Sequence, residues 1–185
     1  MVAKKSHRGG EKMKTEYLLN KEVERVLGCL TDENRLVCKV ILHTGLRVGD
    51  VLALRREDIK EQFWITEAKT GKRRRVGLTR DLVRQLSAIS GTIWVFEHRN
   101  DFRKHRTRQS VYADVKRAAR AYRLKQNVAP HSFRKAYAVD LMEKYGDIER
   151  VKRALNHNSV ATTTIYALAD RLLESKQKEK KKRKK

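Results

Sequence analysis

The sequence predicts an α+β domain that is mostly helical and contains one small three-stranded antiparallel β-sheet. Apolar residues recur with the helical spacing i, i+3, i+4, i+7 over most of the 185 residues. One stretch breaks this pattern: "FWITEAKTGKRRRVGLT" (63–79) places β-formers on both sides of "AKTGK", which indicates a hairpin with a glycine-containing turn. The short apolar segment "TIWVF" (92–96) is the expected third strand.

Helices are expected on both sides of the hairpin. The first begins at Asn20, a good N-cap, and the second ends at Gly45, a residue type common just past a helix C-terminus. A short third helix is expected to begin near Arg47. The only proline, Pro130, opens a helix that ends at Gly146. Further helices are expected at about 80–90, 110–123, 148–155 and 160–173.

The chain length suits one folded domain with charged ends. Residues 1–15 are polar, basic and glycine-containing, so we expect a flexible arm. Residues 16–173 carry the periodic apolar pattern and form the expected domain. Residues 174–185 are dominated by the charge run "KQKEKKKRKK", and we expect a disordered basic tail.

The charge balance is strongly positive. Lys and Arg number 45 against 22 Asp and Glu, a formal net charge of +23. This excess indicates a polyanionic partner, and nucleic acid is the leading candidate. A membrane surface is less favoured, because no basic amphipathic helix with exposed aromatics stands out, and no run of 18 apolar residues predicts a membrane span. A ribosomal-type basic protein would explain the charge equally well.

The two cysteines, Cys29 and Cys38, lie in apolar helical patterns, which favours buried free thiols in a reducing cytosol. No His/Cys cluster has the spacing of a zinc site, so no metal is expected. No cofactor is expected either. The polar N-terminus does not resemble a signal peptide, and a cytoplasmic protein is expected.

The stretch "TGLRVGD" (44–50) places an arginine directly after a helix-ending glycine. A guanidinium is a permanently charged donor fork that matches phosphate oxygens. Asp50 lies three residues after Arg47 on the same helical face and is expected to orient it. A plain surface salt bridge is the alternative.

Two downstream segments carry further reactive groups. "PHSFRK" places His131 and Arg134 at i, i+3, so that one helix face presents a titratable group and a phosphate ligand. "LNHNSVATTTIY" offers His157 and Tyr166, and a tyrosine hydroxyl can attack phosphorus when cations lower its effective pKa. The alternatives are a solvated helix start and an ordinary half-buried tyrosine.

Taken in order, these segments resemble the catalytic domain of tyrosine recombinases, the phage-integrase family. That family has an arginine in "TGLR" followed by an acid, a lysine on a β-hairpin, an "H-x-x-R" helix, then "L-G-H-x-S" and a tyrosine. The corresponding positions here are Arg47, Lys69, His131, Arg134, His157 and Tyr166. The resemblance covers residues 16–170 and implies the catalytic-domain fold of the family. Asn156 replaces the usual glycine before the histidine, and Lys135 replaces a common histidine after the arginine.

Only 46 residues precede Arg47, where typical members have a separate core-binding domain. The resemblance therefore implies a short, catalytic-domain-only member, or a fragment of a longer chain. It also implies a prokaryotic or viral origin and a nucleoid-associated protein.

The resemblance implies site-specific DNA recombination without a cofactor. Arg47, Arg134 and His157 would bind the scissile phosphate, and Tyr166 would attack it to give a 3′-phosphotyrosyl bond. His131 would help remove the tyrosine proton, and Lys69 would protonate the departing 5′-oxygen. Integration, excision, inversion and resolution all remain open as outcomes.

Other basic residues are expected to contact the DNA backbone and make binding depend on salt. They are Lys72, Arg73, Arg74, Arg75, Arg103, Lys104, Arg106 and Arg108. The last four belong to "FRKHRTR" (102–108), which is expected to be a loop. The expected partners are double-stranded DNA and further copies of the chain, as a dimer or tetramer on DNA.

Two other functions fit the same residues. One is a non-catalytic DNA-binding protein that has the recombinase fold. The other is a relaxase of the type IB topoisomerase kind, with the same chemistry but no partner strand.

Overall fold

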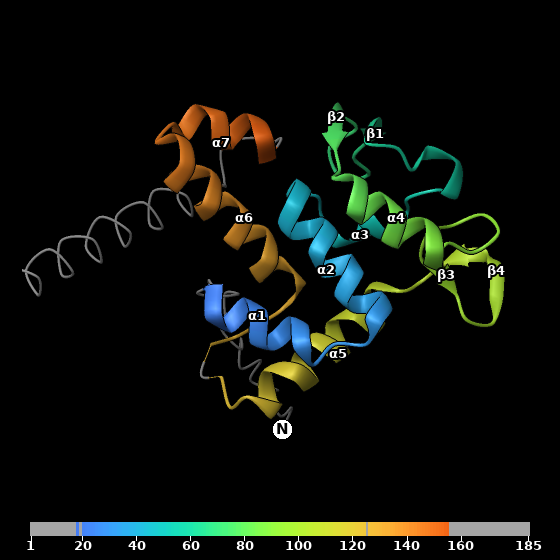
Figure 1. Ribbon diagram of the computed structural model, residues 1–185, viewed down its shortest axis with the longest axis horizontal. Coiled ribbons are helices and arrows are strands. Elements are labelled where there is room, and N and C mark those ends of the chain that lie inside the picture. Colours follow the sequence, from blue (N-terminus) through green and yellow to red (C-terminus); the bar gives the residue numbers. More distant parts are fainter. Residues whose placement is uncertain (1–17, 19, 125, 156–185) are drawn as a thin grey trace, which may run out of the picture.

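The computed structural model of the protein describes residues 18, 20–124 and 126–155. Figure 1 shows the order of its elements along the chain. They are α1 (Asn20–Gly28), α2 (Asp32–Thr44), α3 (Val48–Leu52), a 3₁₀ turn (Arg56–Asp58), β1 (Gln62–Thr66), β2 (Arg73–Gly77), α4 (Arg80–Ile89), β3 (Glu97–His98), β4 (Asp101–His105), α5 (Arg108–Ala121), α6 (Pro130–Tyr145) and α7 (Ile148–Leu155).

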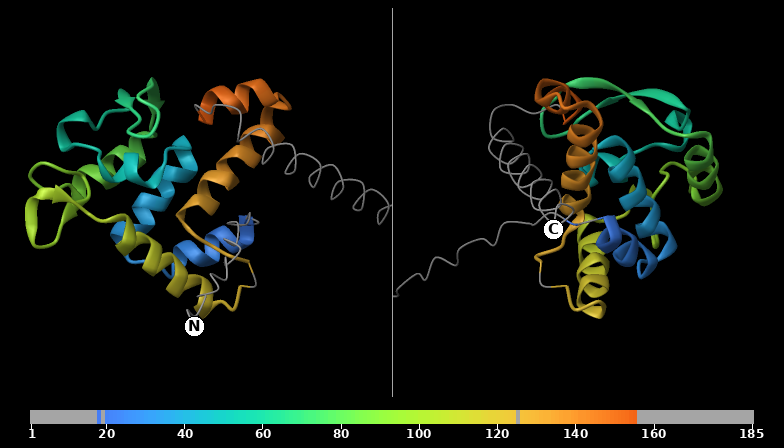
Figure 2. Two further views of the ribbon diagram at one scale, coloured as in Figure 1. Left: turned by 180° about the vertical axis from the view of Figure 1, so that it is seen from behind. Right: turned by 60° about the vertical axis from the view of Figure 1, so that its left-hand side comes forward.

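Helix α2 is the centre of the core. It packs against α1, α3, α4, α5 and α6, and Figures 1 and 2 show α6 on one side of it and α4 on the other. Its inward residues Val37, Cys38 and Val40 have no exposed surface. Burial on several sides explains why this helix is apolar around most of its circumference.

A residue from a distant part of the chain caps the start of α2. The Asp114 carboxylate of α5 accepts hydrogen bonds from the N–H and hydroxyl of Thr31, both 3.0 Å, and from the amide of Asn34 at 2.8 Å. Helix N-termini leave N–H groups unpaired, and a carboxylate there also interacts favourably with the positive end of the helix dipole. Asp114 therefore joins α5 to α2.

Two predicted helix ends are confirmed. Gly45 follows α2 with φ +65°, and its N–H donates to the carbonyl of Ile41 at 2.8 Å. Gly146 follows α6 with φ +64°. Both have the left-handed backbone that glycine adopts without a Cβ penalty.

The mostly helical α+β class is confirmed, but the single three-stranded sheet is wrong. The described residues form two separate two-stranded antiparallel sheets, β1–β2 and β3–β4. Segment 92–96 is not a strand, although Trp94 makes one isolated bridge to Arg55. The Glu97 carboxylate accepts the N–H of Thr92 at 2.7 Å and bends this segment back on itself.

The expected basic loop at 102–108 is also wrong. Most of it is β4, and Arg108 begins α5. The sequence pattern does not predict this strand, because its side chains are mainly exposed and charged and show no apolar alternation.

A small second core joins α6 to α7. Ala138 of α6 packs with Val151 and Leu155 of α7, apart from the main cluster. Helix α7 and the β1–β2 hairpin lie at the same end of the molecule (Figures 1 and 2). Among the described helices, none is long and apolar enough to cross a membrane. The expected arm, tail and 160–173 helix lie outside the described residues.

Candidate active site

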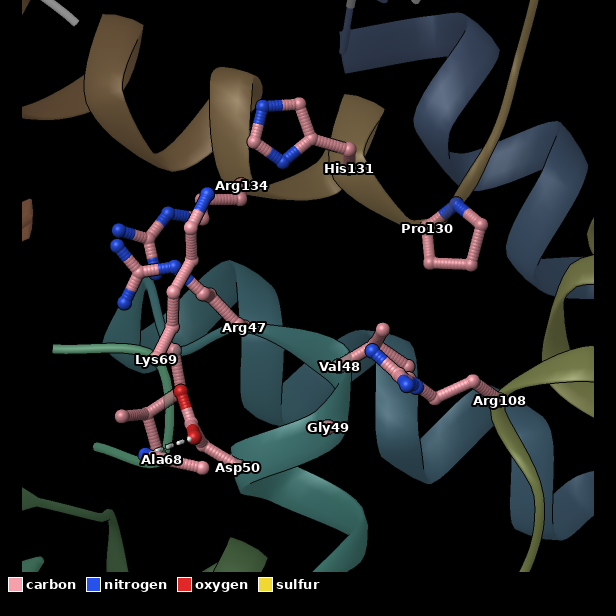
Figure 3. Close-up of a pocket in the computed structure, with 11 residues that line it drawn as sticks. Arg47, Val48, Gly49, Asp50, Ala68, Lys69, Arg108, Pro130, His131 and Arg134 are labelled. Carbon is pink, nitrogen blue, oxygen red and sulfur yellow. Dashed lines mark hydrogen bonds between the residues drawn. The ribbon is translucent and has the colours of Figure 1, made fainter. Parts of the chain in front are cut away.

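A pocket of about 470 Å³ opens where four segments meet. The segments are the start of α3, the turn after β1, and the first turns of α5 and α6. Figure 3 shows the basic side chains that converge on this pocket. They are Arg47, Lys69, Arg108, His131 and Arg134. The structure thus brings together four of the six positions that the family resemblance implied.

Arg47 is placed by the sharp connection between α2 and α3. It is the N-cap residue of α3 and follows the left-handed Gly45 by two residues. Its guanidinium donates from Nη1 to the carboxylate of Glu67. Within the described part of the chain, one nitrogen of Arg47 is engaged by an acid, which leaves the other donors for an anion.

Arg134 lies in the first turns of α6 and is almost fully buried, at 2% exposure. Its Nη2 donates to the carbonyl of Leu155 at 2.7 Å. Its Nε and Nη1 are buried and have no hydrogen-bond partner among the described residues. Burial and the nearby charge of Arg47 lower its pKa to about 10, which still leaves it charged at neutral pH. Unpaired buried donors on a cation are expensive unless an anion binds them.

Lys69 lies on the turn between β1 and β2, and its side chain is exposed in the pocket. The turn is fixed by backbone bonds from Thr70 and Gly71 to the carbonyl of Glu67, at 3.2 and 2.9 Å. Figure 3 shows Lys69 reaching toward Arg134. The hairpin therefore places the Lys69 amine in the same pocket as the guanidinium groups of Arg47 and Arg134.

The sequence predicted that Asp50 orients Arg47, but in the structure the Asp50 carboxylate binds elsewhere. Its Oδ1 accepts the N–H of Ala68 at 3.0 Å, and its Oδ2 has no partner among the described residues (Figure 3). The first turn of α3 turns this carboxylate toward the hairpin, where the Ala68 N–H needs an acceptor. Asp50 therefore anchors the turn that carries Lys69.

The carboxylate partner of Arg47 is Glu67, which the sequence analysis missed. Its side chain is fully buried and also lies 3.3 Å from Nε of Arg74. One signal was available: Glu67 is the single acid in the basic stretch 63–79. A lone acid at a strand end among arginines indicates a buried charge partner.

His131 lies at the mouth of the pocket, where protein atoms remove part of its hydration although the residue keeps solvent access. This desolvation, followed by the charges of Arg134, Lys135, Arg47 and Lys69, lowers its pKa from 6.5 to about 4. The imidazole is therefore neutral at pH 7 and able to accept a proton.

Six of the eight basic residues predicted to contact DNA have exposed side chains, and two are only partly exposed. Lys72, Arg73 and Arg75 are exposed on the hairpin, and Arg103 and Lys104 are exposed on β4. Arg108 is exposed and lines the pocket itself. Arg106 is only partly exposed and pairs with Glu33.

Arg74 is a correction to the prediction. Its Nη2 donates to the carbonyl of Thr44 at 2.7 Å, and its Nη1 donates to the carbonyl of Ala154. Its Nε lies 3.3 Å from the Glu67 carboxylate, as an ion pair without a hydrogen bond. Arg74 therefore ties the hairpin to the ends of two helices and is not a free surface charge.

His157 and Tyr166 lie outside the described residues, so their roles stay predictions. The described chain ends at Leu155, whose carbonyl Arg134 binds. Within the described ranges, no group of three His, Cys, Asp or Glu side chains is arranged to hold a metal ion.

The fold and this pocket define a class of protein that is already known. The sequence matches the phage integrase family over residues 16–171. The chain therefore belongs to the phage integrase family.

Particular relatives agree with this assignment. A tyrosine recombinase of Thermosipho africanus is 28% identical over 162 residues, covering 82% of this chain and 56% of the relative. Tyrosine recombinase XerD of Mycobacterium tuberculosis is 31% identical over 155 residues, covering 76% and 49%. The chain thus spans about half the length of these curated relatives.

Solved structures share the fold. XerA recombinase superposes with a TM-score of 0.70 at 20% identity, covering 94% of this chain and 66% of that one. XerH site-specific recombinase, in a pre-cleavage complex with its difH substrate, gives a TM-score of 0.66 at 26% identity, covering 84% and 51%.

Proposed function

We propose that this protein is a site-specific DNA recombinase that cuts and rejoins strands through a 3′-phosphotyrosyl intermediate. One observation carries the proposal: Arg134 presents two buried donors beside Arg47 and Lys69 that have no hydrogen-bond partner among the described residues, and a bound anion would satisfy them. Membership of the phage integrase family makes a DNA phosphodiester the expected anion. The activity is assigned to residues 16–173.

In the first step, Arg47 and Arg134 bind the non-bridging oxygens of the scissile phosphate. Both guanidiniums are held before DNA arrives, Arg47 by Glu67 and Arg134 by the Leu155 carbonyl. Preorganised donors stabilise the charge that develops in the transition state without reorganisation. His157 adds a third donor to the same oxygens.

The Tyr166 oxygen then attacks phosphorus in line. A bond forms between the tyrosine oxygen and phosphorus while the bond from phosphorus to the 5′-oxygen breaks. His131, neutral at pH 7, accepts the tyrosine proton. Lys69 gives a proton to the departing 5′-oxygen, which leaves as a hydroxyl.

The reverse step joins a new strand. A 5′-hydroxyl from another duplex attacks the phosphotyrosine, and Tyr166 leaves. The covalent intermediate conserves the energy of the broken bond, so the exchange needs no ATP. The proposed steps use protein groups alone.

Strand exchange requires two cleaved duplexes, so more than one copy of the chain acts together. XerH has been solved on its DNA substrate, and lambda integrase, which shares the fold, has been solved as a tetramer on a Holliday junction. We propose a dimer or tetramer on double-stranded DNA, in a nucleoid-associated protein of prokaryotic or viral origin. The exposed basic residues of the hairpin and of β4 contact the DNA backbone.

The test is capture of the covalent intermediate. The full chain is incubated with a pool of nicked duplexes of randomised sequence, denatured, and examined for protein that migrates with DNA. We expect an adduct with wild type and none with Tyr166→Phe, and sequencing the trapped DNA identifies the site. Absence of an adduct, with DNA still bound, would indicate a non-catalytic DNA-binding protein.

A second assay separates recombination from relaxation. Supercoiled plasmids that carry one or two copies of the trapped sequence are incubated with the protein. Recombinant products only from the paired sites support the proposal. Relaxation of both plasmids without recombinants would indicate a relaxase.

A further inference from the structure

Glu67 and Arg74 form a buried ion pair, and neither residue bonds to the DNA or transfers a proton in the proposed reaction. Glu67 is fully buried, and its Oε1 lies 3.3 Å from Nε of Arg74. Charged pairs are rarely placed out of solvent, because desolvation offsets much of their attraction. Their contacts indicate what the pair holds together.

Glu67 controls the turn that presents Lys69. Its Oε2 accepts the Arg47 guanidinium and lies 3.3 Å from the hydroxyl of Thr70. Its carbonyl accepts the N–H groups of Thr70 and Gly71, and its own N–H donates to the carbonyl of Lys72 at 3.0 Å. One residue therefore fixes the backbone of the Lys69 turn and one guanidinium of the proposed phosphate site.

Arg74 extends these contacts to two helix ends. It binds the carbonyl of Thr44, the last residue of α2, and the carbonyl of Ala154 near the end of α7. The last carbonyls of a helix have no partner within the helix, and a cation there also interacts favourably with the negative end of the helix dipole. Thr44 lies three residues before Arg47 in the sequence.

Arg134 makes the matching contact on the next residue. It binds the carbonyl of Leu155, so two arginines hold consecutive carbonyls at the end of α7. The chain continues from there directly to Asn156 and His157. The end of α7, directly before the sequence segment with His157 and Tyr166, is therefore fastened to the site.

From these contacts we infer that Glu67 and Arg74 are positioning residues that couple three parts of the site. They join the phosphate-binding Arg47, the turn that carries Lys69, and the end of α7 from which the Tyr166 segment departs. This inference rests on the proposed function for its effect on cleavage, but the coupling itself exists without DNA. It predicts that a change at the hairpin reaches α7.

The first test follows backbone hydrogen exchange in the full chain without DNA. Glu67→Gln keeps the size of the side chain but removes its charge, and the side-chain hydrogen bonds and ion pairs of Glu67 among the described residues go to Arg47, Thr70 and Arg74, not to α7. We expect faster exchange both in the turn at 67–71 and at the end of α7, residues 151–155. Glu61→Gln is the matched control, because Glu61 is an exposed acid beside the same hairpin, and its side chain pairs with the exposed Arg80. A response confined to the turn, or one that the control shares, overturns the coupling.

The second test uses the nicked duplex recovered by adduct capture. For Glu67→Gln and Arg74→Lys, we expect DNA affinity to change less than about twofold, while adduct formation at saturating DNA falls by roughly 10- to 100-fold, as expected when reacting groups are misplaced. Glu61→Gln should match wild type. Unchanged adduct rates, or a loss explained by weaker binding or a large drop in Tm, would overturn the positioning role.

The two tests fail in different ways. If wild type forms no adduct, the proposed recombinase function fails, and the exchange experiment still decides whether Glu67 and Arg74 couple the hairpin to α7. If wild type forms the adduct and the variants behave like Glu61→Gln, the function stands and the positioning inference is wrong.

Discussion

The ring of Tyr137 lies against Gly45. A Cβ at Gly45 would come within 2.4 Å of both Cδ1 and Cε1 of that ring, and within 3.3 Å of a methyl of Leu155. This contact presses the start of the α2–α3 connection, which leads to Arg47, onto α6 and α7. The glycine is thus required twice, for its left-handed φ of +65° and for the space its missing side chain leaves.

Gly45→Ala is expected to destabilise the protein by about 2–4 kcal/mol, the sum of a strained left-handed alanine and an overpacked contact. Gly71→Ala is the matched control, because Gly71 has the same φ of +65° but no atom within 4 Å of the new methyl. It should lose only the backbone part, about 1 kcal/mol. Urea unfolding measures both. Equal losses of unfolding free energy in the two variants would show that the Tyr137 contact does not add to the cost of Gly45→Ala.

Asp114→Ala is expected to cost about 2–4 kcal/mol, because it leaves the capped groups of Thr31 and Asn34 without their charged acceptor. Asp81→Ala is the control, since Asp81 is an exposed acid whose ion pair with Arg84 is solvated. Thermal and urea unfolding give the difference. A loss no larger than that of Asp81→Ala would contradict the capping role.

The same carboxylate makes stability depend on pH. Burial alone would raise the pKa of Asp114, but hydrogen bonds from Asn34, Thr31 and Arg117 outweigh it and lower the pKa. The folded state therefore binds the proton more weakly than the unfolded state. This stabilisation is complete above the unfolded value of about 3.9 and is lost as pH falls through the lower folded value. In Asp114→Asn, the free energy of unfolding should therefore fall less steeply as the pH is lowered through this acidic range.

His131 is expected to titrate near its lowered pKa of about 4, and not near 6.5. Because the folded pKa is depressed, its contribution to stability is present above 6.5 and is lost as pH falls toward 4. Removing the charge in Lys135→Gln should move the pKa of His131 upward, whereas Lys144→Gln, near the far end of α6, should not. Proton NMR titration of the imidazole reads both. An unshifted wild-type value near 6.5 would contradict the cationic environment.

Arg47→Ala is expected to reduce adduct formation by about 100- to 1,000-fold, the usual effect of losing one preorganised donor. Folding should survive, because Glu67 keeps Arg74 as a partner. The substitution should nevertheless cost about 1–3 kcal/mol of stability, since it weakens the pairing of a buried carboxylate. In a Glu67→Gln background that cost should shrink. A double-mutant cycle by urea unfolding checks it, and simple additivity would show that the pair is not coupled.

The hairpin arginines are expected to differ in their response to salt. Arg73→Gln should lower the slope of log affinity against log salt by about one, as expected for one lost phosphate contact. Arg74→Gln should leave that slope unchanged and instead reduce stability, because its nitrogens face Thr44, Ala154 and Glu67. Fluorescence anisotropy on a labelled duplex over a range of salt gives the slopes. A lower slope for Arg74→Gln would restore it as a DNA contact.

Local signals in the sequence were sufficient for most elements and for several site residues. Helical periodicity and the glycines at 45 and 146 gave the helix ends, because left-handed capping is a property of the residue type. The order of Arg47, Lys69, His131 and Arg134 indicated a shared site, and the four line one pocket. The β3–β4 pair was missed, because a charged, exposed strand carries no apolar alternation.

The sequence by itself determined which chemical groups this protein has and where along the chain they are available. Only the tertiary structure decided their partners. In the folded chain Glu67 binds Arg47, Asp50 binds the N–H of Ala68, and Arg74 binds the carbonyl of Thr44 in the interior. The physical reason is that partner choice among charged groups depends on burial and on distances across the fold. Those are set by how α2, α6, α7 and the hairpin pack together, and spacing along one helix does not encode them.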